Sequence, residues 1–356
     1  MRKEPTFAVL GAGNTGVSTA GVLALSGFHV NLCELPAFGR SVEAIRAKSG
    51  IDVEGEFGVG HARLNMITTD VKSAVEGVDV LLMSSPAYGH EAFTRACAPH
   101  LRDGQVAVCV SYFGALRMAK LLSDMKIRAD VTIGETIGCV YACRRTGPTK
   151  VVIMRRKEGL PVAAFPATRT GRLVETMNTF ASTVPATNVL ETSINNVNPW
   201  SHVSGVILNA GRIEATKGGF DFYSEGITPA VTRLRAALDK EKMAVAGALG
   251  FRQVSHEDWN SRLYKTALKE KYKAISGAPS DLRHRYLVED MSYGIVPIAS
   301  IGRTLGVETP NMNAAIRVAS ILSEVDYWEE GVTARKLGLE GLDAEQMNRY
   351  ASEGRL

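Results

Sequence analysis

The sequence predicts an α/β chain in which a doubly wound parallel sheet is followed by an all-helical domain. In the first half, short apolar runs alternate with amphipathic segments, which is the pattern of parallel strands joined by helices on both faces of a sheet. From about Val189 this pattern gives way to long amphipathic segments. A length of 356 residues is enough for two cores, and we expect domains at residues 1–186 and 187–356.

The first predicted unit is a strand, a glycine-rich turn and a helix. The apolar run Phe7–Leu10 predicts a buried strand, and Thr15–Leu25 has small and aliphatic residues at helical spacing. In the turn GAGNTG, the first glycine permits a tight bend, the second lets the backbone approach a pyrophosphate, and the third lets the helix pack closely on the strand. We therefore predict a nucleotide-binding turn that contains Gly11, Gly13, Asn14, Thr15 and Gly16.

The second predicted strand supplies the carboxylate that such a turn requires. It covers Phe28–Cys33 and is followed by Glu34, about 20 residues beyond the first glycine. A carboxylate there accepts hydrogen bonds from the ribose hydroxyls of an adenosine and repels a 2′-phosphate. The prediction is a Rossmann-type domain that binds NAD. NADP is the less favoured cofactor, although Arg40 could pair with its extra phosphate.

The rest of the first half continues the alternation. Residues 40–69 are expected to hold a helix and a hairpin. Further strands, with helices between them, are predicted over Val78–Ser84, Gln105–Val110 and Val131–Thr136. Residues that follow strand ends lie on the ligand side of such a sheet, so Ser85 and Pro86 are expected to contact the cofactor. His90 lies in the same loop, where a lone histidine is more often solvated than reactive.

The second half predicts long helices. They are expected over Leu190–Thr216, Pro229–Leu249, His256–Lys273, Ile295–Leu305 and Pro310–Glu324. The pairs Thr228-Pro229 and Thr309-Pro310 each place a proline at the first helical position after a capping threonine. A helical domain next to a dinucleotide-binding domain is expected to form a cleft for a small substrate.

Two polar segments of the helical half hold the candidate reactive groups. In Ser193–Gly205, SINNVNPWSHVSG, His202 has a side chain suited to proton transfer near neutral pH. A kinked helix with a hydrogen-bonded core histidine would give the same pattern. In Arg283–Asp290, RHRYLVED, Asp290 could orient His202 and Arg285 could grip a carboxylate with two hydrogen bonds. A solvated, charged helix start is the competing interpretation of that segment.

Composition argues against several other classes of function. The net charge is +4 with a pI near 8.7, but no basic run is interleaved with aromatic residues, so no nucleic-acid partner is predicted. No apolar stretch is long enough to span a membrane. The five cysteines show no metal-ligand spacing, and we expect buried, reduced thiols, no metal and a cytoplasmic location.

Several longer motifs together make the sequence resemble the octopine/nopaline, or opine, dehydrogenase family. They are GAGNTG, IGET at Ile133–Thr136, NVNPWSHVSGVILNA at Asn196–Ala210, YSEGITP at Tyr223–Pro229, RYLVEDMSYGIVP at Arg285–Pro297 and ARKLGLEGL at Ala334–Leu342. The resemblance extends along most of the chain. Two positions depart from the family pattern, because Thr15 replaces a frequent glycine and Val203 replaces a frequent proline.

The resemblance implies an NAD(H)-dependent enzyme that joins an α-keto acid, such as pyruvate, to the amino group of an amino acid and that also oxidises N-(carboxyalkyl)amino acids. It implies that His202 is the acid/base group and that Asp290 is its partner. The implied substrate-binding residues are Arg285, Asn198 and Tyr223, and Glu135 of IGET is expected to contact the cofactor. A helical domain like that of 6-phosphogluconate dehydrogenase is expected, and a homodimer is one option.

Two other functions stay open from the sequence. A β-hydroxyacid or ketopantoate-type reductase would share the two-domain plan and reduce a carbonyl without an amine. Such enzymes usually rely on a lysine of the helical domain, and the segment around His202 contains none. The second option is a protein that binds NAD without chemistry. The sequence fixes neither the amino acid, the keto acid nor the stereochemistry.

Overall fold

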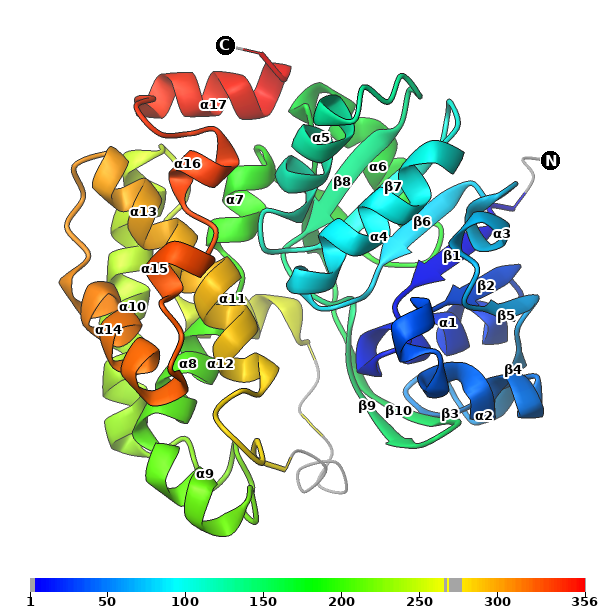
Figure 1. Ribbon diagram of the computed structural model, residues 1–356, viewed down its shortest axis with the longest axis horizontal. Coiled ribbons are helices and arrows are strands. Elements are labelled where there is room, and N and C mark those ends of the chain that lie inside the picture. Colours follow the sequence, from blue (N-terminus) through cyan, green and yellow to red (C-terminus); the bar gives the residue numbers. More distant parts are fainter. Residues whose placement is uncertain (1–3, 266–267, 269–276, 356) are drawn as a thin grey trace. The chain divides into compact units, whose positions relative to one another are not determined.

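The computed structural model describes residues 4–265, 268 and 277–355 (Figure 1). The chain forms two compact units. The first runs to Val189 and includes a short segment that begins at Leu263, and the second comprises Leu190–Arg262 and the chain beyond residue 268. The first unit is built on parallel strands and the second on helices, so the predicted fold class is confirmed.

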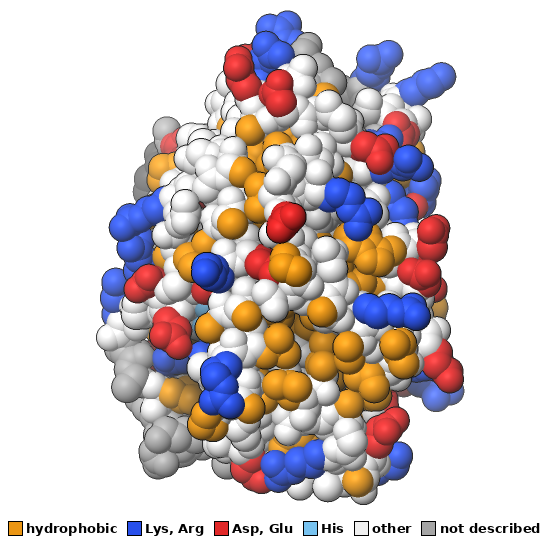
Figure 2. Space-filling view, turned by 90° about the vertical axis from the view of Figure 1, so that its left-hand side faces the viewer, with side chains coloured by type: hydrophobic (Ala, Val, Ile, Leu, Met, Phe, Trp, Pro, Cys, Tyr) orange, Lys and Arg blue, Asp and Glu red, His pale blue; other side chains and the backbone are white. Residues whose placement is uncertain are grey.

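The face in Figure 2 carries charges of both signs around an area where apolar side chains gather. Large exposed apolar side chains of the second unit include Val318 and Ile321, both on α14 (Pro310–Ser323). An exposed apolar area is typical of contact with another chain, and the homodimer stays a prediction. None of the described helices is both long and apolar enough to cross a membrane.

An eight-stranded sheet forms the centre of the first unit. Its strands, in chain order, are β1 (Phe7–Leu10), β2 (Val30–Cys33), β5 (Met66–Thr68), β6 (Val80–Met83), β7 (Val106–Val110), β8 (Thr132–Thr136), β11 (Leu160–Phe165) and β12 (Thr183–Pro185). They lie side by side in the order β12-β11-β8-β7-β6-β1-β2-β5, and all neighbours are parallel except β8 and β11. Because the strand order reverses between β1 and β6, the carboxyl ends of these two strands form the expected ligand crevice.

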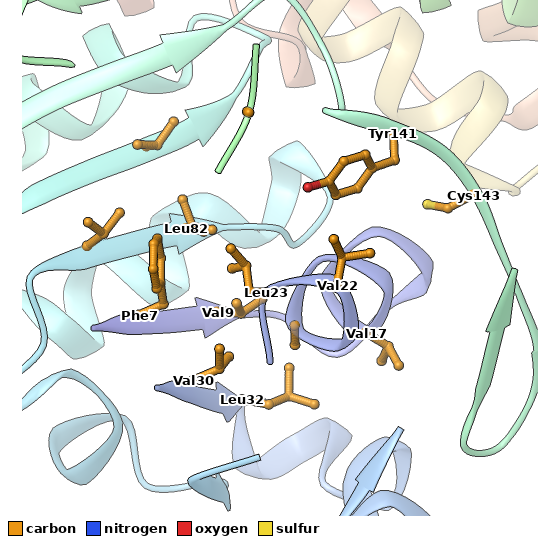
Figure 3. Packing of buried hydrophobic residues seen from close by; sticks show 14 of the residues in the cluster. Phe7, Val9, Val17, Val22, Leu23, Val30, Leu32, Leu82, Tyr141 and Cys143 are labelled. Atoms are coloured by element: carbon orange, nitrogen blue, oxygen red, sulfur yellow. The ribbon is translucent and has the colours of Figure 1, made fainter. Parts of the chain in front are cut away.

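Helices connect the strands of this sheet. They are α1 (Asn14–Leu25), α2 (Arg40–Lys48), α3 (Val71–Val75), α4 (His90–Cys97), α5 (Gly114–Asp124) and α6 (Thr170–Met177). Figure 3 shows Leu23 of α1 beside Val9 of β1, and Val17 on the opposite side of the same helix. These residues are buried and belong to one apolar core, so the strand and helix of the glycine-rich unit stabilise each other.

A second sheet lies against the same helix. It has the order β4-β3-β10-β9, from β3 (Gly50–Gly55), β4 (Gly60–Arg63), β9 (Tyr141–Gly147) and β10 (Lys150–Arg156). The hairpin expected within residues 40–69 is β3 and β4, which pair antiparallel. A Cβ atom on Gly21 of α1 would lie 2.9 Å from Cγ2 of Val53 of β3, so this sheet approaches the helix closely. Since α1 has sheets on two sides, its small and apolar residues surround it rather than forming one stripe.

The second unit is helical. Its helices are α7 (Val189–Ile194), α8 (Asn198–Leu208), α9 (Ala210–Thr216), α10 (Pro229–Ala248), α11 (His256–Leu263), α12 (Arg285–Asp290), α13 (Val296–Thr304), α14, α15 (Tyr327–Glu330), α16 (Ala334–Leu337) and α17 (Ala344–Glu353). The single helix predicted over Leu190–Thr216 is wrong, because breaks at Asn195 and Asn209 divide it into three. The helix predicted over His256–Lys273 ends at Leu263, and much of the remainder lies outside the described residues. Both predicted prolines lie in the first turn of their helices.

Ser201 of α8 belongs to a buried polar cluster with His256, Asp239 and Lys242. The hydroxyl of Ser201 is 3.0 Å from Nε2 of His256, and the carboxylate of Asp239 accepts a hydrogen bond from the backbone N–H of His256. Asp239 also pairs with Lys242, a lysine that is itself buried. Burial lowers the pKa of His256 to about 4, so its ring is neutral at physiological pH.

We expect acid to destabilise the protein through His256. Its pKa lies near 4 when folded and near the ordinary value of about 6.5 when unfolded, so between these values the unfolded chain binds a proton that the folded chain excludes. The free energy of unfolding should therefore fall as the pH drops through 6.5, by on the order of 2 kcal/mol at about pH 5 from this group. Urea unfolding of the wild type and of His256→Asn, each at about pH 7.5 and pH 5, measures this change in the free energy of unfolding. Equal pH dependence in both proteins would contradict the prediction.

Candidate active site

The glycine-rich turn has the geometry of a phosphate-binding loop. Gly11 follows β1 with φ of +104°, a conformation that other residues rarely adopt. A Cβ atom on Gly16 would lie 1.8 Å from the carbonyl oxygen of Gly11, so only glycine lets α1 start this close to the strand. Around Gly13, by contrast, no atom lies within 4 Å of the position of a Cβ atom. The backbone is therefore open at the glycine where a pyrophosphate is expected to approach, and α1 presents its N-terminus there.

Two side chains at neighbouring strand ends complete this loop. The carboxylate of Glu34, after β2, accepts hydrogen bonds from the backbone N–H groups of Ala12 at 2.7 Å and Leu35 at 2.8 Å. Ser85, after β6, packs against Gly11, and its buried hydroxyl has no hydrogen-bond partner among the described residues. Pro86 directly follows and precedes a 3-10 turn. An oriented carboxylate and a buried hydroxyl without a partner both fit a dinucleotide that supplies the missing polar groups.

The side chains of Asn14 and Thr15 contact the segment around β9. Asn14 Nδ2 donates to the carbonyl of Cys143 at 3.1 Å, and Asn14 Oδ1 accepts from the backbone N–H of Arg145 at 2.6 Å. The Thr15 hydroxyl lies 3.4 Å from Sγ of Cys139. These two predicted cofactor residues are thus available to a cofactor chiefly through their main-chain N–H groups, at the start of α1.

Arg145 is a residue of this loop that the sequence did not reveal. Its guanidinium donates to the carbonyl oxygens of Ala12 and Ser41, both at 2.9 Å. It thereby ties β9 to the glycine-rich turn and to the start of α2. Arg145 is distant from both residues in sequence and belongs to no motif. It comes here because β9 forms a hairpin with β10, and β10 pairs with the distant strand β3 in the second sheet.

Two other expectations for the first unit need correction, those for His90 and Cys139, whereas the cofactor contact of Glu135 stays a prediction. Glu135 is fully buried in β8, and its carboxylate accepts from the backbone N–H of Ala115 at 3.1 Å, so it holds the start of α5. His90 is not solvated, because it is buried at the start of α4, and burial lowers its pKa to about 3. Cys139 is half-buried, whereas the other four cysteines are buried as expected.

The helical unit places His202 and Asp290 together. His202 lies on α8, and Asp290 is the last residue of α12, where the helix passes into a π-helical turn at Met291–Ile295. Nδ1 of His202 lies 2.8 Å from Oδ2 of Asp290. Asp290 is 0% exposed and His202 is 5% exposed. The histidine and the aspartate, 88 residues apart in the sequence, thus form a buried pair.

Aromatic rings hold the imidazole in position. The ring of Tyr286, on α12, stacks on that of His202 with 3.8 Å between centroids and 12° between planes. Phe222 approaches edge-on at 6.3 Å. On the remaining ring nitrogen, Nε2, the hydroxyl of Tyr223 lies at 2.9 Å. The hydrogen bond to Asp290 and the stacked tyrosine together fix the direction in which Nε2 points.

The predicted substrate-binding residues lie on the same elements. Asn198 is the first residue of α8 and precedes His202 by four positions, so both lie on one face of the helix. Arg285 begins α12, and its guanidinium forms an ion pair with Glu289 at 3.0 Å and lies 5.2 Å from the centre of the Tyr286 ring. Asn198 and Arg285 therefore lie on the two helices, α8 and α12, that carry His202 and Asp290.

This arrangement can move a proton. An ionised carboxylate only accepts hydrogen bonds, so Asp290 keeps a proton on Nδ1 and leaves the lone pair of Nε2 directed at the tyrosine hydroxyl. It also stabilises the imidazolium that forms when Nε2 takes up a proton. Within the part of the chain that is described, no three His, Cys, Asp or Glu side chains are grouped as metal ligands.

Comparisons with known proteins agree with this geometry. Residues 185–323 match the family model described as NAD/NADP octopine/nopaline dehydrogenase, alpha-helical domain. The chain is 34% identical to an opine dehydrogenase of Arthrobacter sp. (strain 1C), over 97% of this chain and 98% of that protein. A solved structure of octopine dehydrogenase with NADH and pyruvate has a TM-score of 0.71 at 23% identity and covers 96% of this chain and 97% of that one.

The competing reductase fold is also similar, but less so. A solved ketopantoate reductase from Ralstonia eutropha JMP134 has a TM-score of 0.60 at 17% identity and covers 90% of this chain and 98% of that one. At this identity the likeness shows a shared fold only. The similarity to the Arthrobacter protein extends over nearly the whole of both chains and carries the assignment that the motifs predicted. The chain therefore belongs to the opine dehydrogenase family.

Proposed function

We propose that this chain catalyses the NAD(H)-dependent reductive condensation of an α-keto acid, such as pyruvate, with the amino group of an amino acid. The reverse reaction oxidises the CH–NH bond of an N-(carboxyalkyl)amino acid. The observation that carries the proposal is the buried hydrogen bond between His202 and Asp290 in the helical unit. Support comes from the family, from the opine dehydrogenase relative and from the fold shared with an octopine dehydrogenase solved with NADH and pyruvate.

The cofactor would bind in the first domain, at about residues 1–186. Backbone N–H groups of the glycine-rich turn and the N-terminus of α1 would hold its pyrophosphate, and Glu34 would accept from its ribose hydroxyls. NAD is favoured over NADP because a 2′-phosphate would meet the carboxylate of Glu34. When bound, the cofactor supplies or accepts the hydride.

The helical domain, at about residues 187–356, would manage the protons and the two carboxylated reactants. The amine attacks the keto carbon and water leaves to give an imine, so two protons in all must pass from the nitrogen to the leaving oxygen. The pair His202–Asp290 accepts each proton from the nitrogen and returns it to the oxygen. Arg285 would hold a carboxylate, while Asn198, one turn before His202 on α8, and Tyr223, whose hydroxyl contacts Nε2, would orient the reactants.

The proposal predicts that NADH oxidation depends on an amine. With NADH and pyruvate, at least one amino acid of a full panel should raise the rate by about tenfold or more over the amine-free rate, because condensation creates the group that is reduced. Turnover without an amine would favour a carbonyl reductase. Tight NADH binding, measured by fluorescence, with no turnover on any pair would favour a protein that binds NAD without chemistry.

The cellular setting is also part of this proposal. All five cysteines are free thiols, which is the state that a reducing compartment maintains. We therefore place the activity in the cytoplasm.

A further inference from the structure

The hydroxyl of Tyr223 contacts the buried imidazole of His202, and Tyr223 itself is exposed. We propose that Tyr223 is a further catalytic residue, which passes each proton between Nε2 of His202 and the reacting atoms of the substrates. This inference rests on the proposed function and specifies the route of its protons. His202 then acts on the substrates through the tyrosine rather than by direct contact.

Access to the imidazole is the first argument. His202 is 5% exposed, whereas Tyr223 is 41% exposed. Asp290 occupies Nδ1 of the imidazole, and the ring of Tyr286 covers one face at 3.8 Å. The tyrosine hydroxyl lies 2.9 Å from Nε2, the nitrogen that must exchange protons. Tyr223 therefore connects Nε2 of the buried imidazole to a side chain that solvent reaches.

The backbone that carries Tyr223 is firmly held, which is the second argument. The carboxylate of Asp221 accepts from the backbone N–H groups of Tyr223 at 3.0 Å and Ser224 at 2.7 Å. The neighbouring Phe222 is fully buried against α8, where a Cβ atom on Gly205 would lie 2.5 Å from its ring. With its turn anchored from both sides, the tyrosine is preorganised at Nε2, and moving it away would disrupt these contacts.

The proton balance of the relay is complete in both directions. When Nε2 is protonated, it donates to the tyrosine oxygen, so the hydroxyl proton can point at the substrate. As the C–O bond of the amine adduct breaks, the leaving oxygen takes the tyrosine proton, the tyrosine oxygen takes the proton of Nε2, and neutral imidazole remains. When the amine nitrogen loses a proton, both transfers run in reverse, and this exchange occurs twice for each imine formed, because water leaves with two protons from the nitrogen. No net charge stays on the tyrosine at any stage of the relay.

The test is Tyr223→Phe, which keeps the ring and removes the hydroxyl. With saturating NADH, pyruvate and the best amino acid, kcat should fall by about 100-fold while each KM changes by less than about threefold. For the wild type, a plot of kcat against the deuterium content of the solvent should be curved, which indicates that two protons are in transfer. In Tyr223→Phe this curvature should be lost, because another step or route limits the rate. Tyr350→Phe, on α17, is the matched control and should behave as the wild type.

Two outcomes would overturn the relay. If substrates displace Tyr223 to reach the imidazole, Tyr223→Phe keeps or raises kcat. If Tyr223 only binds a substrate, KM rises and kcat is unchanged. Failure of the proposed function can be told apart from failure of the relay, because in that case the wild-type protein itself shows no amine-dependent turnover.

A measurement without substrate tests the hydrogen bond itself. In nitrogen NMR spectra of the cofactor-free protein, the signal of Nε2 of His202 should shift in Tyr223→Phe, while that of Nδ1, which contacts Asp290, should shift less. The dispersion of the other signals reports whether the variant is folded. An unchanged Nε2 signal in a folded variant overturns the relay whatever the reaction.

Discussion

Replacing His202 with asparagine is expected to lower kcat by about 1,000-fold while the Kd for NADH stays within about twofold of the wild-type value. Asparagine keeps a polar side chain on α8 but cannot take up and return a proton. The carboxylate of Asp290 can still accept a hydrogen bond from the amide, so the buried charge keeps a partner. Chemistry should thus be lost while the fold is retained.

Steady-state kinetics and a fluorescence titration with NADH measure the two quantities separately. The variant His29→Asn provides a matched control, because His29 is exposed and lies in the first unit. Loss of NADH binding in His202→Asn would contradict the assignment of cofactor binding to the glycine-rich turn. A variant that retains more than about a tenth of wild-type kcat would remove His202 from the chemistry.

The parts of the fold that could be predicted depend on local sequence. The strand, turn and helix over residues 7–25 carry their own apolar periodicity and glycines, and the structure has them within a residue or two. The second sheet could not be predicted, because β3 pairs in parallel with β10 across about a hundred residues. The same long-range pairing brings Arg145 to the glycine-rich turn and brings the side chain of Asn14 into contact with β9.

In the candidate active site, too, local sequence predicted the segments but not the contacts between them. The unusual polarity around His202 and the RHRYLVED cluster identified two segments, but periodicity does not show that they meet. Packing of α12 against α8 brings Asp290 to Nδ1 and stacks Tyr286 on the ring. The breaks at Asn195 and Asn209 were missed because the residues on both sides have helical spacing, and tertiary contacts decide where each helix ends.

Asp290→Asn is expected to lower kcat by about 100-fold or more, with small changes in KM, although it replaces no atom that exchanges protons with substrate. An asparagine amide can donate to Nδ1, which favours the tautomer with its proton on Nε2. That nitrogen can then no longer accept the proton of the Tyr223 hydroxyl. The variant also loses the negative charge that stabilises the imidazolium in a site where Asp290 is 0% exposed.

The double variant Asp290→Asn/Tyr223→Phe gives the sharper test. The carboxylate, the imidazole and the hydroxyl are proposed to form one proton path. A second interruption of one path should lower kcat little further, so the kcat of the double variant should lie within about fivefold of that of the slower single variant. Independent roles would instead multiply the two losses. Asp124→Asn, at an exposed ion pair with Lys120 on α5, provides the control for loss of one carboxylate and should leave kcat unchanged. A kcat of Asp290→Asn close to that of the wild type would show that the buried charge serves folding alone. The substitution would then change only the free energy of unfolding.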